Sequence, residues 1–307
     1  MQGDGMPDLL SIYDLGKKDI ESYLSEASRL DSALAKGKPP QDLRNKIVAN
    51  LFFEASTRTN TSFQVAALRL GAHPIVFYPE KSSISKGESF ADTIRIFDGY
   101  VDALAIRHPR EGSVQEASGI ASHPVINTGD GGNQHPTQTL IDLYSIKKLK
   151  GKLSGLNITL MGDLKYARAM RSLLYGLALF GQGATLVSPQ SLRMDPSIIA
   201  KVKKEFGVEV KEAAKPDLKS CDILYVCRVQ KERFDDPQEA EREAEGFKLP
   251  RELLRSASPK MAVLHPLPKV DELPPEFDSD PRAKYFEQAK NGVPVRMAIL
   301  KRCILGK

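Results

Sequence analysis

The sequence Glu54-Ala55-Ser56-Thr57-Arg58-Thr59 joins a predicted buried strand to a predicted amphipathic helix. Residues 47–53 (IVANLFF) have the length and the β-branched and aromatic content of a buried strand. After the junction, apolar residues recur at helical spacing until Gly71 ends the pattern. Residues 56–59 therefore lie where unpaired backbone N–H groups and the positive end of a helix dipole converge. Three hydroxyls and a guanidinium there predict a phosphate-binding turn, whereas an ordinary N-cap would not explain Arg58.

The composition is typical of a soluble globular protein, and the length allows two domains: of 307 residues, 41% are hydrophobic and 27% are charged. The longest apolar stretches, such as residues 173–180, are too short to cross a bilayer, and residues 1–7 carry no secretory signal. The three cysteines form no C-x-x-C pair and have no histidine partner at metal spacing, so we expect no metal site and a reduced, cytoplasmic setting. The net charge of +5 is dispersed and Trp is absent, which argues against nucleic-acid binding and favours small anionic substrates.

Short apolar stretches alternate with helical patterns along most of the chain. Besides residues 47–53, strands are predicted at residues 74–78, 103–106, 125–127, 157–161, 184–187, 222–226 and 261–264. Helices are predicted at residues 20–35, 90–100, 167–180 and 196–206, and one is predicted to begin at His135. This alternation predicts an α/β fold of two domains, each a parallel sheet flanked by helices, with a boundary near residue 150. In such sheets, ligands bind beyond the carboxyl ends of the strands.

The residues that follow the predicted strands share one chemistry, the recognition of anions. They are Ser56 to Thr59, Arg107-His108-Pro109, His135 with Gln138, Asp163 to Arg168, Arg228-Val229-Gln230 and His265-Pro266-Leu267-Pro268. A single arginine is more often a surface or ion-pair residue, but a set repeated at six strand ends favours a site. Because the guanidinium fork matches phosphate and carboxylate, the set predicts substrates that carry both groups. Neither a Gly-x-Gly-x-x-Gly turn after a strand nor a Walker lysine motif occurs, which argues against dinucleotide or P-loop binding.

Six segments resemble the signature segments of aspartate carbamoyltransferase catalytic chains, and the resemblance extends from the first helix to Leu305. The segments are Ser56-Thr57-Arg58-Thr59, Arg107-His108-Pro109, His135-Pro136-Thr137-Gln138, Gly162-Asp163-Leu164-Lys165, Arg228-Val229-Gln230-Lys231-Glu232-Arg233 and His265-Pro266-Leu267-Pro268. The first marks the wider carbamoyltransferase superfamily. The ornithine branch would carry a cysteine where this chain has Pro266.

The resemblance implies transfer of the carbamoyl group of carbamoyl phosphate to L-aspartate, giving N-carbamoyl-L-aspartate and phosphate in pyrimidine synthesis. It implies an active site in the cleft between two domains, with no cofactor and no metal. Ser56, Thr57, Arg58 and Thr59 would hold the phosphate of carbamoyl phosphate. Thr59, Arg107 and His135 would donate to the carbonyl oxygen; donors at comparable oxyanion sites contribute roughly 3–4 kcal/mol each.

The resemblance also assigns the remaining contacts to the two substrates. Gln138 would orient the carbamoyl nitrogen, and Arg168 would bind the α-carboxylate of aspartate. Arg228 and Gln230 would bind the β-carboxylate, and the backbone carbonyl of Leu267 would meet the attacking amine. For His135 we favour a polarising role over that of an obligatory general base; the sequence does not fix its protonation.

Residues 82–88 (SSISKGE) are a polar turn, for which a solvated loop is the simplest interpretation. In the family, the matching loop reaches the neighbouring subunit's site and supplies a lysine and a serine. Lys86 matches the lysine and would contact both substrates, while the serine is either Ser82, favoured by spacing, or Ser83. The resemblance therefore implies a homotrimer with shared active sites, and it leaves open whether a separate regulatory chain binds.

Glu54 and residues 235–245 bear on the motion of the two domains. The resemblance implies that Glu54 meets Arg168 and Arg233 when the domains close over the substrates. Residues 235–245 are predicted to form a mobile helical loop over the aspartate site, or a solvated surface helix.

The C-terminal pattern indicates two helices, one ending at Gly292 and another starting at Pro294. By resemblance the second returns to the first domain, so that residues 1–150 and 293–307 bind carbamoyl phosphate and residues 151–292 bind aspartate.

Two rival functions remain at this point. One is a carbamoyltransferase for another amino acid, which Pro266 and Arg228-Val229-Gln230 disfavour. The other is a non-catalytic anion-binding or regulatory module on the same fold, which the complete set of chemical residues disfavours.

Overall fold

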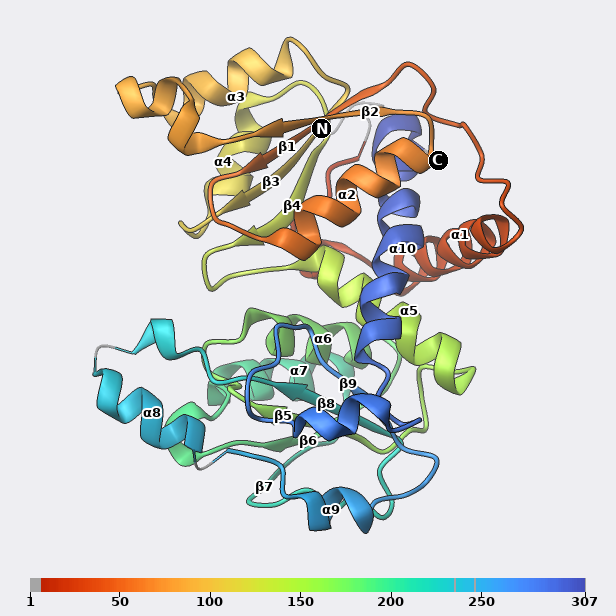
Figure 1. Ribbon diagram of the computed structural model, residues 1–307, viewed down its shortest axis with the longest axis vertical. Helices are drawn as coiled ribbons and strands as arrows, with labels where there is room; N and C mark the ends of the chain where they lie inside the picture. The colour runs from red at the N-terminus through yellow and green to blue at the C-terminus, as the bar shows by residue number, and fades with distance from the viewer. Residues whose placement is uncertain (1–6, 235, 246, 307) are drawn as a thin grey trace. The chain divides into compact units, whose positions relative to one another are not determined.

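The computed structural model describes residues 7–234, 236–245 and 247–306, and the chain forms two compact units. The first unit comprises Met1–Tyr144 and Asn291–Lys307, and the second comprises Ser145–Lys290. Each unit holds one parallel sheet flanked by helices, which confirms the predicted α/β fold (Figure 1). None of the helices within the described residues is both long enough and apolar enough to span a membrane.

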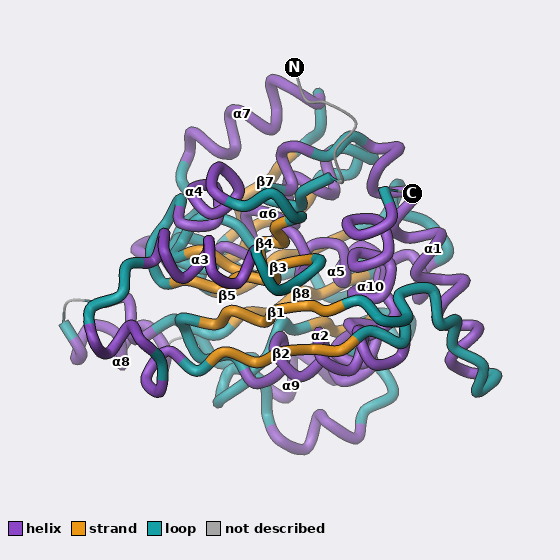
Figure 2. The backbone as a smooth tube through the Cα atoms, turned by 90° about the horizontal axis from the view of Figure 1, so that it is seen from above, coloured by secondary structure: helices purple, strands orange, loops and turns teal. Residues whose placement is uncertain are grey.

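The sheet of the first unit has four parallel strands in the order β2-β1-β3-β4, with β2 at one edge (Figure 2). Its strands are β1 (Ile47–Phe52), β2 (His73–Phe77), β3 (Ala103–His108) and β4 (Val125–Asp130). The helices that begin in this unit are α1 (Lys17–Ala35), α2 (Thr57–Arg69), α3 (Phe90–Asp98), α4 (Ser113–Ile120) and α5 (Pro136–Lys150). Five consecutive buried residues in β1 show that both faces of the sheet are covered, as its unbroken apolar sequence predicts.

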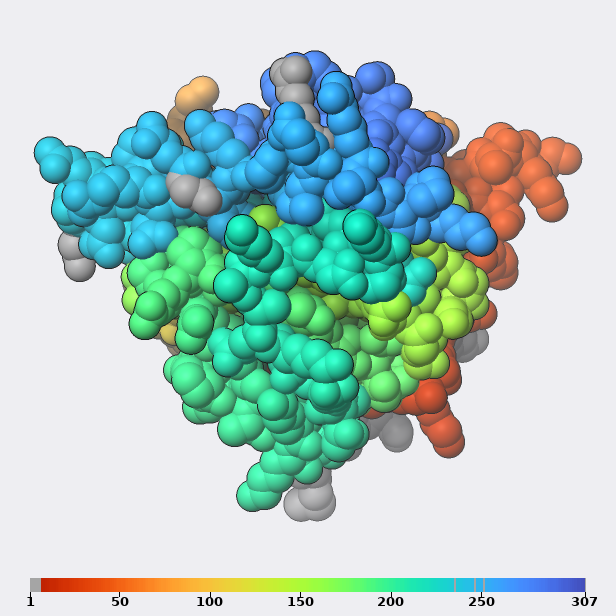
Figure 3. All heavy atoms as spheres, turned by 90° about the horizontal axis from the view of Figure 1, so that it is seen from below, coloured from red at the N-terminus to blue at the C-terminus, as the bar shows by residue number. Residues whose placement is uncertain are grey.

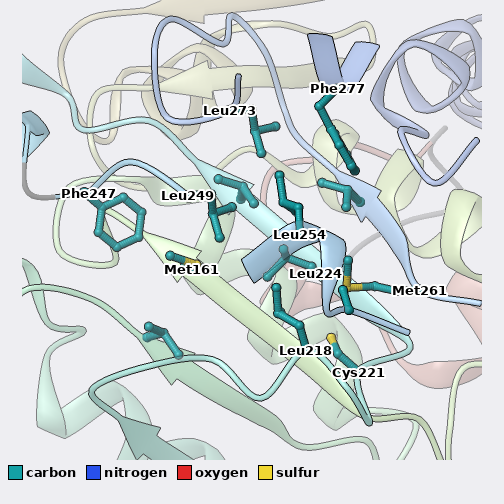
Figure 4. Packing of buried hydrophobic residues seen from close by; sticks show 14 of the residues in the cluster. Met161, Leu218, Cys221, Leu224, Phe247, Leu249, Leu254, Met261, Leu273 and Phe277 are labelled. Atoms are coloured by element: carbon teal, nitrogen blue, oxygen red, sulfur yellow. The ribbon is translucent and has the colours of Figure 1, made fainter. Parts of the chain in front are cut away.

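The second unit has five parallel strands in the order β7-β6-β5-β8-β9. They are β5 (Ile158–Gly162), β6 (Ala184–Val187), β7 (Val210–Ala213), β8 (Ile223–Cys227) and β9 (Ala262–Leu264). The helices are α6 (Arg168–Ala178), α7 (Pro196–Phe206), α8 (Pro237–Glu245) and α9 (Arg251–Arg255), and α10 (Tyr285–Leu305) begins here and continues into the first unit. Leu224 of β8, Met161 of β5 and residues of the later loops pack into one apolar core (Figure 4).

Strand order places a topological switch point in each sheet. In the first unit the chain proceeds from β1 outward to β2, then returns to the other side of β1 for β3 and β4. In the second unit it proceeds from β5 to β6 and β7, then returns to β8 and β9. The crevices at the carboxyl ends of β1 and β3, and of β5 and β8, are therefore the positions where such sheets bind ligands.

One expectation for the C-terminal region is wrong. Tyr285–Leu305 form one continuous helix, α10, with Pro294 inside it, instead of two helices separated at Gly292. An interior proline costs roughly 3 kcal/mol, but burial of a run of residues after it, from Val295 to Leu300, offsets this cost. Gly292 serves packing, since a Cβ there would lie 2.4 Å from the guanidinium of Arg296.

Three elements escaped the sequence patterns: β7, α4 and α9. Strand β7 lies at the sheet edge and has one buried residue, Val210, followed by two exposed ones, so it lacks the apolar run by which the other strands are identified. Helices α4 and α9 have only eight and five residues, which is too short for a clear helical period.

Candidate functional site

The strand-turn-helix predicted around residues 54–59 is present, with β1 ending at Phe52 and α2 starting at Thr57. Ser56 is the N-cap residue in an extended conformation, but its side chain makes no capping hydrogen bond, and no acidic residue lies in the first turn. The alternative of an ordinary N-cap is therefore wrong. The first turn of α2 keeps the positive character that favours an anion.

A buried amide network fixes the start of α2 against the sheet. Asn50 of β1 is fully buried, and its Nδ2 donates to the backbone oxygen of Asn60 at 3.3 Å and to its Oδ1 at 3.0 Å. Gln64 Nε2 donates to the same Oδ1 at 2.9 Å. The first turn of α2 is thus held at the carboxyl end of β1 by side chains that the sequence patterns did not single out.

Arg107 lies beside this turn because of strand register. It pairs with Phe52 across the β1–β3 switch point, and its backbone oxygen accepts from Phe53 N at 2.8 Å. The side chain of Arg107 is 13% exposed, and its guanidinium lies 2.9 Å from the carboxylate of Glu54. Glu54 therefore has a cationic partner within the first unit, and its predicted contacts with Arg168 and Arg233 stay predictions.

Asp130, at the end of β4, organises the turn that leads to His135. Its carboxylate accepts from the backbone N–H groups of Gly112 and Gln134, at 3.1 Å each, and from Asn133 Nδ2 at 2.9 Å. Gly131 has a φ of +52°, and a Cβ there would lie 2.8 Å from the backbone oxygen of Pro109. The loops that follow β3 and β4 are therefore packed together, which brings the segments that carry Arg107 and His135 into one region of the first unit.

His135 immediately precedes the first residue of α5, Pro136. The histidine is 7% exposed, and its backbone oxygen accepts from Gln138 N at 3.0 Å and Thr139 N at 3.2 Å. Its ring nitrogen Nδ1 lies 3.3 Å from the hydroxyl of Thr137. Gln138, one turn into the helix, donates from Nε2 to the buried carboxylate of Asp142 at 2.8 Å. An amide whose NH2 group is held in this way presents its oxygen, an acceptor, on the other side.

The segment with Lys86 forms a short 3-10 helix, Ser83–Lys86. Ser82 caps it: its hydroxyl donates to the backbone oxygen of Pro79 at 2.7 Å and accepts from Ile84 N at 3.3 Å. Ser83 and Lys86 are exposed. The loop is ordered by its own hydrogen bonds, and the choice between Ser82 and Ser83 as a ligand stays open.

In the second unit, Asp163 joins the two segments at the β5–β8 switch point. It follows β5 directly and is fully buried; its carboxylate accepts from the backbone N–H groups of Lys165 at 3.2 Å and Tyr166 at 2.8 Å. The same carboxylate accepts from Gln230 N, after β8, at 3.1 Å. Burial raises the pKa of Asp163, which these backbone donors only partly counter. Asp163 belongs to one of the six motif segments, but no role was predicted for it; its position directly after a strand was the available signal.

Arg168 is the first residue of α6, and Arg228 follows β8. Arg228 forms a bidentate ion pair with Glu232, at 2.9 and 2.5 Å, which raises the pKa of its guanidinium. Leu267, after β9, is partly buried and has a φ of +59°. Residues assigned to aspartate thus follow β5, β8 and β9, three neighbouring strands of one sheet.

Helix α8 covers part of the surface of the second unit (Figure 3). Ala240 and Ala244 are buried, whereas the other described residues of the helix are mostly exposed. The solvated surface helix expected for this segment is therefore present. Among the described residues, no group of three or more His, Cys, Asp or Glu side chains could hold a metal ion.

Comparison with known proteins agrees with this geometry. Residues 7–148 match the model of the aspartate/ornithine carbamoyltransferase carbamoyl-P binding domain, and residues 154–303 match that of the Asp/Orn binding domain. An aspartate carbamoyltransferase catalytic subunit from Archaeoglobus fulgidus is 48% identical over 302 residues, covering 98% of this chain and 100% of that protein. The corresponding subunit from Methanopyrus kandleri is 47% identical, covering 95% of this chain and 96% of that protein.

Solved structures give the same result. The catalytic subunit of M. jannaschii aspartate transcarbamoylase superposes with a TM-score of 0.91 at 44% identity, covering 98% of this chain and 99% of that one. Aspartate transcarbamoylase from Trypanosoma cruzi, in complex with carbamoyl phosphate and aspartate, superposes with a TM-score of 0.92 at 37% identity, covering 96% of both chains. The resemblance inferred from six sequence segments is confirmed, and the chain belongs to the aspartate/ornithine carbamoyltransferase family.

Proposed function

We propose that this chain transfers the carbamoyl group of carbamoyl phosphate to the amine of L-aspartate, giving N-carbamoyl-L-aspartate and phosphate for pyrimidine synthesis. The observation that carries the proposal is the placement of anion-binding residues at the switch points of both sheets. Residues 56–59 and Arg107 flank the switch point between β1 and β3, and Arg168, Arg228 and Gln230 flank that between β5 and β8.

The first unit supplies the groups suited to carbamoyl phosphate. Ser56, Thr57, Arg58 and Thr59 at the start of α2 bind its phosphate through hydroxyls, backbone N–H groups and a guanidinium. Arg107 spans phosphate and carbonyl, and its proximity to Glu54 at 2.9 Å supports this by fixing the guanidinium.

The carbonyl and the carbamoyl nitrogen need opposite partners. His135, Arg107 and Thr59 donate to the carbonyl oxygen, which gains negative charge as the amine attacks. Gln138 accepts from the carbamoyl NH2 group, since its own NH2 group is held by Asp142 at 2.8 Å.

The second unit supplies the groups suited to aspartate. Arg168 binds the α-carboxylate, Arg228 and Gln230 bind the β-carboxylate, and the carbonyl of Leu267 accepts from the amine. A guanidinium at the position of Arg228 favours an anionic side chain and disfavours the cationic side chain of ornithine.

The reaction needs both substrates bound together. The amine lone pair attacks the carbonyl carbon, the bond from that carbon to the phosphate oxygen breaks, and the departing phosphate takes the proton that the amine loses. Positioning and charge stabilisation are the protein's contributions. Replacement of His135 by Gln tests its polarising role: loss of turnover with undiminished binding of a bisubstrate analogue would contradict it.

The deciding experiment is a colorimetric assay of ureido product from carbamoyl phosphate with aspartate, ornithine or no acceptor. We expect product with aspartate alone. Arg228→Gln should raise the KM for aspartate without changing the affinity for carbamoyl phosphate, whereas the control Arg193→Gln, at an exposed arginine of the same unit, should change neither. Absence of product with aspartate would refute the proposed reaction, and product with ornithine would assign the chain to the other branch.

We also propose a homotrimer in which Lys86, with Ser82 or Ser83, completes a neighbouring subunit's site and contacts both substrates. The exposure of Lys86 on an ordered turn supports this. Mixed trimers of Lys86→Ala and Ser56→Ala chains should regain activity through a hybrid site that has both residues; no recovery in confirmed mixed trimers would exclude shared sites. Whether a separate regulatory chain binds is tested by sizing the protein alone and with a candidate regulatory chain.

We also propose a cytoplasmic location, which the three free, buried cysteines among the described residues support.

A further inference from the structure

A buried histidine–carboxylate pair lies next to the segment assigned to the amine of aspartate. His265 follows β9 directly, and its Nε2 lies 2.8 Å from the carboxylate of Glu272. The two side chains are 1% and 5% exposed. Neither residue has a role in the function proposed above, and a buried pair of this kind requires an explanation.

The other ring nitrogen identifies what the pair holds. His265 Nδ1 accepts a hydrogen bond from the backbone N–H of Leu267 at 2.8 Å. A backbone N–H can only donate, so Nδ1 carries no proton and the proton of the neutral ring is on Nε2, facing Glu272. The ring therefore accepts from the amide of Leu267 through Nδ1 and turns its protonated Nε2 towards the carboxylate of Glu272.

Glu272 and His265 are each anchored in the fold by backbone hydrogen bonds. The backbone oxygen of Glu272 accepts from Leu249 N at 3.0 Å, and Leu273 beside it is fully buried in the core (Figure 4). The backbone N–H of His265 donates to Gln288 Oε1 at 2.8 Å. The imidazole is consequently a rigid support.

Leu267 needs such a support because its backbone is in a costly conformation. Its φ of +59° lies in the left-handed region, which costs a residue with a Cβ about 1–2 kcal/mol. The bond from its N–H to the ring is a specific interaction that offsets this cost and fixes the orientation of the peptide. Burial lowers the pKa of His265 despite the adjacent Glu272, so the ring stays neutral and keeps Nδ1 as an acceptor.

We propose that His265 and Glu272 are positioning residues that fix the backbone of Leu267, so that its carbonyl faces the attacking amine of aspartate. The inference rests on the proposed function for the identity of the amine, but the support of Leu267 by the pair does not. Neither residue touches a reacting atom; both act through Leu267.

Two substitutions at His265 separate the two ring nitrogens. In His265→Asn the amide oxygen replaces Nδ1 as the acceptor for Leu267, whereas in His265→Gln the longer side chain replaces Nε2 and leaves Leu267 without an acceptor. Glu272→Leu removes the partner of Nε2, and Glu272→Gln restores an acceptor there. His123→Gln is the control, because His123 lies in the first unit with its ring 3.1 Å from Asp98.

Hydrogen exchange gives a readout that does not depend on activity. In a peptide of residues 265–268, Leu267 is the informative backbone N–H, because Pro266 and Pro268 have none. We expect protected exchange in the native protein and in His265→Asn, and exchange at least about tenfold faster in His265→Gln and Glu272→Leu. An equally protected Leu267 N–H in His265→Gln would overturn the inference. An equally protected Leu267 N–H in Glu272→Leu would overturn the positioning role of Glu272.

Kinetics then test the consequence for aspartate. We expect kcat/KM for aspartate to fall about 30-fold in His265→Gln, with the affinity for inorganic phosphate unchanged, and to recover most of that loss in His265→Asn. Equal losses in the Asn and Gln variants would mean a merely structural histidine and would overturn the positioning role. If the native protein does not carbamoylate aspartate at all, the proposed function fails, and hydrogen exchange alone still decides whether the pair supports Leu267.

Discussion

Replacement of Asp163 by Asn should separate binding of aspartate from binding of carbamoyl phosphate. The carboxylate of Asp163 accepts hydrogen bonds from Lys165 N and Tyr166 N on one oxygen and from Gln230 N on the other. An amide has one oxygen, so at least one of these N–H groups must face an NH2 group instead. The least disruptive orientation keeps the bonds to Lys165 and Tyr166 and releases Gln230.

The magnitude follows from that single lost acceptor. A buried N–H without a partner costs about 1–3 kcal/mol, so we expect the free energy of unfolding to fall by about 2 kcal/mol. The same release frees the segment after β8 that carries the proposed ligands of the β-carboxylate. If a similar energy is lost from the transition state, kcat/KM for aspartate falls about 30-fold.

The assay measures the initial rate against aspartate at saturating carbamoyl phosphate, with phosphate affinity and urea unfolding measured on the same preparations. Asp222→Asn is the matched control, since Asp222 binds Asn157 N at 2.9 Å and so joins the amino ends of β5 and β8. It should lower stability without changing kcat/KM. Unchanged kinetics in folded Asp163→Asn, or equal kinetic losses in the two variants, would refute the reasoning.

Three further outcomes are expected. Ser56→Ala should weaken carbamoyl phosphate binding while lowering stability by less than the ~1 kcal/mol of a working N-cap, because Ser56 makes no capping bond; a matching fall in stability would contradict this. Gly162→Ala should destabilise the protein by more than about 3 kcal/mol, since a Cβ would lie 2.1 Å from the backbone oxygen of Cys227. Gly207→Ala, where a Cβ meets nothing within 4 Å, should cost only about 1 kcal/mol. Thermal unfolding measures both. Hydrogen bonding to Arg29 is the main cause that lowers the pKa of Glu26 from 4.5 to about 2. The ionised form of Glu26 therefore stabilises the fold above pH 4.5, and this stabilisation is lost as the pH falls towards 2. In urea unfolding, the stability of Glu26→Gln should differ from that of the native protein at pH 7 and converge with it at acidic pH.

The sequence alone determined the fold class and the residues at the strand ends. An unbroken apolar run such as that of β1, and the hydroxyl and arginine residues after it, are local features whose period and chemistry can be recognised without a structure. The same local rules were wrong at Pro294, because they could not weigh one missing hydrogen bond against the burial of residues after it.

Only the tertiary structure decided which strand ends are neighbours. The pairing of Phe52 with Arg107, the link from Asp163 to Gln230 and the contact of His265 with Glu272 each join positions that no local period relates. Strand order arises from long-range packing of whole sheets, and a buried carboxylate gains its partners only when that packing brings their donors within about 3 Å. The residues that the sequence singled out are therefore candidate ligands by chemical type, and strand order decides which of them lie at the two switch points.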